Sequence, residues 1–307
     1  MHKEIVSKCF VYESTLSRLT TIERYGILIF NMNILEAIAL GALQGITEFL
    51  PISSSGHLIV ARDFFGITIE NNLLFDVFLH GATLLSIIVY FRRDIFTIIR
   101  NLFVSERSVE GDGEEEVNVL SVPPRRFLFL LVVATVPAVV VGLLIRNLEE
   151  VMRTSGVVAT SLIIGGIIIF LAEKFEIKRE SKSKLTLKSS VIIGCFQVLS
   201  LIPGMSRSGM AISGGFLSGL SREHAIRFSF LLALPVIGGL VFLGFIDILR
   251  LGVGEIDLPA FISGAIAAFA VGIFVIHFLI HFLERNTFTV FIIYRMFLAV
   301  LIFAFLF

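Results

Sequence analysis

The feature that most constrains this sequence is a pair of polar, proline-broken segments that recur at one fixed offset. The first is Gln44 to His57 (QGITEFLPISSSGH) and the second is Gln197 to Gly209 (QVLSLIPGMSRSG). We interpret them as an internal duplication, which in membrane proteins commonly builds a site where two repeats face each other. A chance likeness between two Gly/Ser-rich helix-packing stretches is the alternative. The identities at an offset of 153 positions are Gly41 and Gly194, Gln44 and Gln197, Ser53 and Ser206, Ser55 and Ser208, and Gly56 and Gly209.

The rest of the chain indicates that these segments lie inside a membrane. The sequence is 56% hydrophobic and 16% charged, whereas soluble domains carry about 25% charged residues. Ionisable groups cost roughly 3 kcal/mol or more at the centre of a bilayer, so such groups mark candidate functional sites. The formal net charge of zero argues against a nucleic-acid partner. Cys9 and Cys195 have neither the spacing of a disulfide framework nor that of a zinc site.

The apolar segments predict an all-α polytopic membrane protein with six transmembrane helices and two re-entrant helical hairpins. A helix over 34–49 would be about 24 Å long at about 1.5 Å per residue, which is short of a hydrocarbon core of about 30 Å. Pro51 prevents its continuation, and a second short helix follows over 58–65. The other predicted hairpin pairs 189–202 with 210–220. The predicted spans are 73–91, 127–145, 156–172, 227–246, 259–282 and 290–307.

We predict a single membrane domain over 33–307 that follows an N-terminal extension over 1–32. Two basic segments, the hydrophilic loop 92–126 and the linker 173–188, lie on the same side of the predicted bundle. The positive-inside tendency makes that side cytoplasmic, so the first hairpin enters from outside, the second from the cytoplasm, and the repeats are inverted. The basic N-terminal extension, however, would then lie outside. The predicted repeats cover about 33–145 and 189–307.

The two loops offer complementary chemistry if they are placed tip to tip. Ser54 in the first loop corresponds to Arg207 in the second, so a hydroxyl group faces a permanent cation. Arginine suits bidentate recognition of phosphate oxygens, and glycines let backbone N–H groups approach the same anion. A membrane-buried phosphate or diphosphate is the ligand that best uses this set. The predicted substrate-binding residues are Gln44, Ser53, Ser55, Gly204, Ser206, Ser208 and Gly209.

Glu48 and His57 supply the acid–base groups of the first loop. Gln44 and Glu48 share a helix face and can hold a hard divalent cation whose coordination a phosphate completes. An interhelical hydrogen bond of Gln44 and a protonated Glu48 are the alternatives. His57, beside Ser54, can serve as general base, general acid or nucleophile. The repeat alignment also places Asp76 and His80 near the site.

The motifs QGITEFLPISSSGH and PGMSRSGMAISGG resemble those of the undecaprenyl-diphosphate phosphatase family, the bacitracin-resistance type of membrane enzyme, over about residues 33–307. The resemblance implies six spans with two inverted re-entrant hairpins in the cell membrane. It also implies a site open toward the outer face and a divalent cation, usually Mg²⁺ or Ca²⁺. The implied site residues are Gln44, Glu48, Ser54, His57 and Arg207. The chain has Ala211 where the family often has threonine.

The sequence therefore predicts hydrolysis of undecaprenyl or another polyprenyl diphosphate to the monophosphate and inorganic phosphate, which recycles the lipid carrier. The nucleophile stays open between Ser54, His57 and a water activated by His57. The alternative is a transporter or flippase of polyprenyl phosphates, since inverted repeats with broken helices are usual in secondary transporters. The expected partners are the lipid substrate and the bilayer, and a homodimer stays open. The predicted catalytic residues are Glu48, Ser54, His57 and Arg207.

Overall fold

The computed structural model describes residues 32–67, 69, 72–103, 122–177, 184–251 and 257–306. Within these residues the chain is all α and contains no β-strand. Nearly all of the predicted N-terminal extension, the acidic run 110–116 and the middle of the predicted basic linker lie outside the described residues. The elements are α2 (Ile34–Thr47), α3 (Ser54–Phe65), α4 (Asn72–Tyr90), α5 (Arg92–Phe103), α6 (Pro124–Ile145), η2 (Arg146–Leu148), α7 (Glu149–Met152), α8 (Ser155–Ile177), α9 (Leu187–Leu199), α10 (Arg207–Ser218), α11 (Arg222–Leu251), α12 (Leu258–Arg285) and α13 (Thr289–Phe305).

Five of the described helices, namely α4, α6, α8, α11 and α12, are long and apolar enough to cross a membrane. The sixth predicted span corresponds to α13, which is apolar but has only 17 residues. At about 1.5 Å per residue, α13 is about 26 Å long, slightly less than the thickness of a hydrocarbon core. The chain is an all-α polytopic membrane protein, as the sequence predicted.

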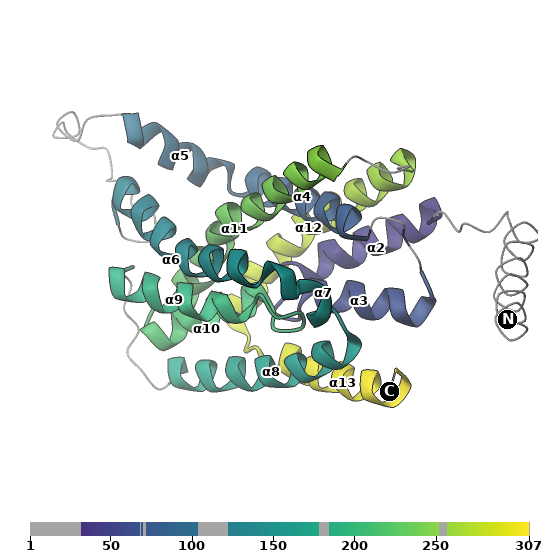
Figure 1. The fold of residues 1–307 in the computed structure, drawn as a ribbon. Helices are drawn as coiled ribbons and strands as arrows, with labels where there is room; N and C mark the ends of the chain where they lie inside the picture. The colour runs from purple at the N-terminus through teal and green to yellow at the C-terminus, as the bar shows by residue number, and fades with distance from the viewer. Residues whose placement is uncertain are drawn as a thin grey trace, which may run out of the picture.

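Two hairpins of half-length helices enter this bundle from opposite ends. In Figure 1, α2 and α3 come in from the right and α9 and α10 from the left, and the loops of the two hairpins meet in the middle. Their arms have 14, 12, 13 and 12 residues. A capping box between Asn33 and Glu36 starts α2, and a similar box at Thr186 starts α9. Proline in each loop stops the first arm from continuing.

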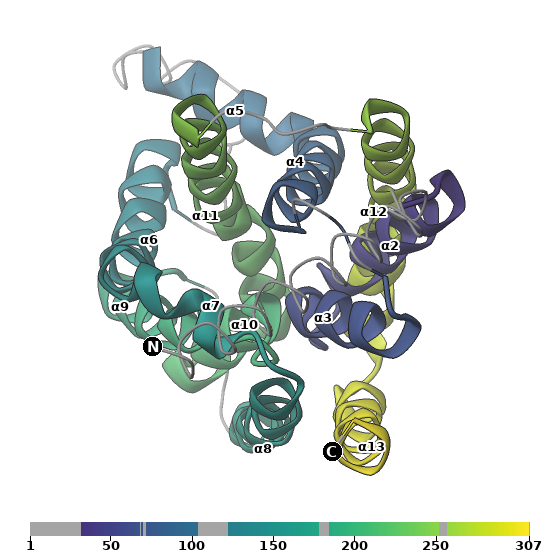
Figure 2. The same cartoon turned by 45° about the vertical axis from the view of Figure 1, so that its right-hand side comes forward.

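Each hairpin packs against a spanning helix of the other half of the chain. The first arm of the first hairpin, α2, lies along α12, and the first arm of the second, α9, lies along α6 (Figure 2). The equivalent glycines of the two repeats make both approaches possible. A Cβ atom on Gly41 would lie 2.1 Å from the carbonyl oxygen of Gly264 in α12, and one on Gly194 would lie 2.7 Å from that of Ala134 in α6. The two repeats are therefore interlocked.

Replacing Gly41 by alanine is expected to lower thermal stability, because the added Cβ would clash with backbone atoms of α12. Backbone atoms cannot move aside as a flexible side chain can. Overpacking of this kind costs about 1–3 kcal/mol. The measurement is the fraction of detergent-purified protein that stays monodisperse in size-exclusion chromatography after heating. Gly81→Ala in α4 is the matched control, because the nearest atoms to its Cβ lie 4.0 Å away. Equal midpoint temperatures for the two variants would contradict the close approach.

Two predicted loop segments are wrong where the structure describes them. The loop predicted over 92–126 begins with the helix α5, whose Ile98 is buried and whose Asp94 pairs with Arg227 of α11 at 2.6 Å. The linker predicted from residue 173 begins only after α8 ends at Ile177. A charged residue at 173 suggested the end of a span, but Glu173 is buried and pairs with Arg222 at 3.0 Å. In both places a charged residue of the helix, Asp94 of α5 or Glu173 of α8, forms an ion pair with an arginine of α11.

Candidate active site

The second arm of each hairpin begins at an equivalent serine with an unusual backbone. Ser53 precedes α3 with φ +75°, and Ser206 precedes α10 with φ +77°; no other described non-glycine residue has a positive φ. The side chain of each serine accepts a hydrogen bond from the N–H group three residues on, at 3.4 Å in the first loop and 3.2 Å in the second. Such backbones cost about 1–3 kcal/mol and cluster at functional sites. The likeness between the repeats thus extends to a strained backbone at their loops.

The two loops are bonded directly to each other. The backbone N–H group of Gly204 donates to Ser53 Oγ at 3.1 Å, and Ser208 Oγ donates to the carbonyl oxygen of Leu50 at 3.1 Å. Gly204 has φ +98°, and a Cβ atom there would lie 2.6 Å from the carbonyl oxygen of Val158, so this position needs glycine. The contacts place the N-termini of α3 and α10 at one point inside the bundle.

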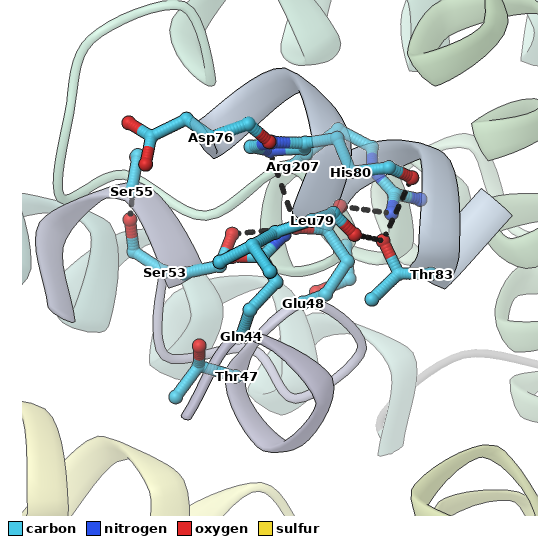
Figure 3. Close-up of polar contacts among 12 residues, drawn as sticks. Gln44, Thr47, Glu48, Ser53, Ser55, Asp76, Leu79, His80, Thr83 and Arg207 are labelled. Carbon is cyan, nitrogen blue, oxygen red and sulfur yellow. Dashed lines mark hydrogen bonds and ion pairs between the residues drawn. The ribbon is translucent and has the colours of Figure 1, made fainter. Parts of the chain in front are cut away.

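A buried carboxylate, that of Glu48, lies where the N-termini of α3 and α10 meet (Figure 3). Arg207 Nη2 donates to its Oε1 atom at 3.0 Å. Its Oε2 atom accepts hydrogen bonds from Ser54 Oγ at 2.6 Å and Gln44 Nε2 at 2.9 Å. His80 Nε2 lies 3.6 Å from the same oxygen. Four helices, α2, α3, α4 and α10, therefore converge on one side chain.

Two buried polar atoms next to Glu48 have no hydrogen-bond partner among the described residues. One is the donor Arg207 Nε and the other is the acceptor Gln44 Oε1. Buried polar groups are nearly always satisfied, so an exception calls for a ligand or water. Arg207 Nη1 donates to the carbonyl oxygen of Ser229 at 3.3 Å, which fixes the plane of the guanidinium group. The site offers an unused N–H group to an anion and an unused oxygen to a cation.

The oxygen atoms of Gln44 and Glu48 are the donor set that the sequence predicts for a cation. No group of three or more His, Cys, Asp or Glu residues that could hold a metal occurs in the described part of the chain. A hard divalent cation with few protein ligands is typical of phosphate chemistry, where the substrate and water fill the other positions. The unpaired Gln44 Oε1 beside a carboxylate fits such a cation. The metal ligands predicted from the sequence are therefore adjacent in the structure.

His57 faces away from this cluster. Its Nδ1 atom lies 2.7 Å from the carbonyl oxygen of Ser53, which can only accept, so Nδ1 carries a proton. Its Nε2 atom then accepts a hydrogen bond from the hydroxyl group of Tyr294 at 2.8 Å, and the two rings stack with their centroids 5.6 Å apart. Neither ring nitrogen bonds to Glu48, Ser54 or Arg207, so the catalytic role of His57 stays a prediction.

His80 is the histidine that reaches the cluster. Its Nδ1 atom lies 2.7 Å from the carbonyl oxygen of Asp76 and therefore carries a proton. Its Nε2 atom is the ring nitrogen that faces Glu48. The carboxylate of Asp76, by contrast, is bonded to Arg62 and Arg153. Of the two residues that the repeat alignment placed near the site, His80 belongs to the cluster and Asp76 ties α4 to its neighbours.

The other predicted substrate-binding residues lie in the two loops and in the first turns of α3 and α10, where their polar atoms bond mainly to one another. The hydroxyl oxygens of Ser53 and Ser55 are 3.4 Å apart, and those of Ser206 and Ser208 are 3.2 Å apart. The N–H group of Gly209 is bonded to Ser206. Their contact with a substrate stays a prediction. Sequence reasoning missed Tyr294 and its neighbour Arg295, for which the only signal was a polar pair in the last apolar segment.

Comparison with known proteins identifies the family. Residues 37–301 match the family model described as bacitracin resistance protein BacA. A protein of Marinobacter nauticus is 36% identical over 278 residues, which cover 89% of this chain and 99% of the relative. One of Rubrobacter xylanophilus is 38% identical over 277 residues, with 90% and 99% covered. Both relatives are named undecaprenyl-diphosphatase. The chain belongs to the bacitracin resistance protein BacA family.

Proposed function

We propose that this chain hydrolyses undecaprenyl diphosphate to undecaprenyl monophosphate and inorganic phosphate. The observation that carries the proposal is the buried Glu48 carboxylate, which has the Ser54 hydroxyl on one oxygen and the Arg207 guanidinium on the other. The nucleophile and the phosphate-binding cation are thus each one hydrogen bond away from a carboxylate that can accept the proton of the nucleophile. The names of the relatives point to the same reaction.

In the proposed mechanism, Arg207 binds the terminal phosphoryl group through its unpaired Nε–H and helps to offset the charge that develops in transfer. Ser54 Oγ attacks this phosphorus as Glu48 takes the hydroxyl proton. The P–O bond to the bridging oxygen breaks, and undecaprenyl monophosphate leaves. Water then hydrolyses the phosphoserine, which releases inorganic phosphate and restores Ser54. The first helical residue of α3 is Ser54, so the positive end of the helix dipole favours the transferred anion.

A divalent cation, Mg²⁺ or Ca²⁺, held by Gln44 Oε1 and Glu48, is part of the proposal. When bound, it would neutralise oxygens of the diphosphate and help to orient them. Gln44→Leu is therefore expected to raise the Mg²⁺ concentration for half-maximal activity by about tenfold or more, and EDTA is expected to abolish activity. Gln197→Leu is the matched control, because Gln197 is the equivalent residue of the other repeat, is equally buried and donates its side-chain hydrogen bond to the carbonyl oxygen of Ala134. Equal Mg²⁺ dependence of the two variants would remove Gln44 from the cation site.

We place the protein in the cell membrane with the site open toward the outer face. The start of α6, the end of α8 and the start of α9 lie on the left of Figure 1 and carry Arg125, Arg126, Lys174 and Lys188. The positive-inside tendency makes this end cytoplasmic. The α2–α3 hairpin, which carries Glu48 and Ser54, enters from the opposite end. A homodimer stays a prediction.

The test of the proposed function is phosphate release from a C55 polyprenyl diphosphate by detergent-purified protein with Mg²⁺. We expect turnover that EDTA stops and that Glu48→Ala removes. A flippase of polyprenyl phosphates, which the comparisons do not favour, would bind the lipid and release no phosphate. Bound but intact lipid on well-folded protein would therefore overturn the phosphatase and restore the flippase.

A further inference from the structure

Arg295 of α13 is fully buried, and every hydrogen bond that its guanidinium group makes to the described residues goes to a backbone carbonyl group. Its Nη1 atom donates to the carbonyl oxygen of Pro51, in the loop of the first hairpin, at 3.0 Å. Its Nη2 atom donates to Gly204 at 2.9 Å and Met205 at 3.3 Å, in the loop of the second. The remaining bonds reach α8, from Nε to Leu162 at 3.1 Å and from Nη2 to Ser161 at 3.2 Å.

These bonds account for a charge that would otherwise be costly to bury. No carboxylate pairs with Arg295 in the part of the chain that the structure describes. An arginine inside a membrane protein is tolerated only where its N–H groups find partners. The carbonyl groups of Pro51, Gly204 and Met205 lie outside the helices, so no helical hydrogen bond satisfies them. The guanidinium group supplies the partners that both loops lack.

Helix α8 is shaped to receive this side chain. A Cβ atom on Gly165 would lie 2.2 Å from Arg295 Nη2, and one on Gly166 would lie 2.4 Å from the terminal carbon of Met296. Gly165 therefore leaves the space that the guanidinium group occupies beside α8, and Gly166 leaves the space that Met296 occupies. Because α8 is a long spanning helix, it gives both loops a common rigid reference.

We infer that Arg295 is a positioning residue that sets the distance between the reacting groups of the two hairpins, an inference that rests on the proposed function. Pro51 lies between Glu48 and Ser54 in the first loop, and Met205 lies two residues before Arg207 in the second. The planar fork of one guanidinium group bonds to both loops at once. A displacement of either loop would separate the Ser54–Glu48 pair from Arg207, and about 1 Å of misplacement can cost 10²-fold in rate.

Lysine in place of Arg295 keeps the charge but has three donors without the fork. Arg295→Lys is expected to lower kcat about 10²-fold, with a smaller change in KM. Gly165→Ala is expected to act in the same direction, because its Cβ displaces the guanidinium group without removing it. Gly239→Ala is the matched control, since its Cβ has no atom within 4 Å, and it is expected to leave kcat unchanged. An unchanged kcat of Gly165→Ala would contradict the inference. A loss of kcat in Gly239→Ala as large as that in Gly165→Ala would also contradict it, because the added methyl group would then act without displacing Arg295.

A double-mutant cycle separates positioning from mere stability. If Arg295 places Arg207 against the first hairpin, Arg207→Ala should cost about 10³-fold in the parent protein but at most about tenfold in the Arg295→Lys background. A purely structural Arg295 would reduce the folded fraction and leave the effect of Arg207→Ala undiminished. Equal costs of Arg207→Ala in the two backgrounds, measured on monodisperse protein, would overturn the inference.

The same cycle is run on binding of a methylene-bridged, non-hydrolysable analogue of the lipid diphosphate. Parent protein that binds this analogue without releasing phosphate from the natural diphosphate would reject the proposed function, and the binding cycle would still decide on Arg295. If the parent protein hydrolyses the diphosphate but the effects of Arg295→Lys and Arg207→Ala are additive, only the role of Arg295 is rejected.

Discussion

The Arg207→Lys variant is expected to lose about 10³-fold in kcat/KM, the scale on which arginine side chains act in phosphoryl transfer. Arg207 holds Glu48 with Nη2 and the carbonyl oxygen of Ser229 with Nη1, which leaves Nε–H for the phosphoryl group. One ammonium group cannot occupy these three directions at fixed spacing. The variant keeps the charge, so it should insert and fold like the parent protein.

The measurement is the initial rate of phosphate release at several concentrations of the C55 diphosphate. Arg227→Lys is the matched control, because this residue lies on α11, forms an ion pair with Asp94 at 2.6 Å and is partly exposed. Exposed pairs contribute about 1 kcal/mol or less, so its kcat/KM should stay within about threefold of the parent value. An Arg207→Lys enzyme within tenfold of the parent would show that charge alone suffices and that the fork is not used.

The Ser54→Ala variant is expected to lose at least about 10³-fold in kcat, since removal of a nucleophile leaves only binding and electrostatic stabilisation. Ser54 Oγ is 2.6 Å from Glu48 Oε2, the shortest hydrogen bond that the carboxylate makes. Loss of a hydroxyl group alone, with no change in charge, should leave KM for the lipid near its parent value. The parent protein should also form an acid-stable phosphoserine in a rapid quench with diphosphate labelled in its terminal phosphate.

Ser263→Ala is the matched control for this variant. Ser263 lies in α12, and its hydroxyl donates to the carbonyl oxygen of Ala260 in the same helix at 2.9 Å. We expect its kcat to stay within about tenfold of the parent value. Equal losses in the two variants, or full activity of Ser54→Ala, would move the nucleophile to His57 or to water.

The hairpins and the central pair of the site were predictable because their signals are local. Proline in each loop and the fixed offset between the repeats determine where both hairpins break. The offset also aligns position 54 with position 207, and the structure places Ser54 and Arg207 on the same carboxylate. A duplication that buries polar groups leaves few alternatives to bringing them together.

The direction of His57 and the place of α13 were not predictable from the sequence. His57 follows Ser54 by three residues, so both were expected to act together, but the rotation of α3 turns the ring toward Tyr294. That rotation depends on packing between helices far apart in the sequence. Arg295 likewise has no nearby acidic residue to suggest a partner, because its partners are backbone carbonyls. Backbone acceptors leave no trace in a sequence.

The interlocked packing of the two repeats has a consequence for the origin of the molecule. The surface that covers α2 belongs to α12, and the surface that covers α9 belongs to α6. A half-length ancestor with this architecture could not have completed its own bundle, because the helix it needed belonged to an oppositely oriented copy. Such an ancestor would have had to insert with dual topology and pair antiparallel. Gene fusion would then have fixed the two orientations in one chain and freed the halves to diverge, one toward a carboxylate and a hydroxyl, the other toward an arginine.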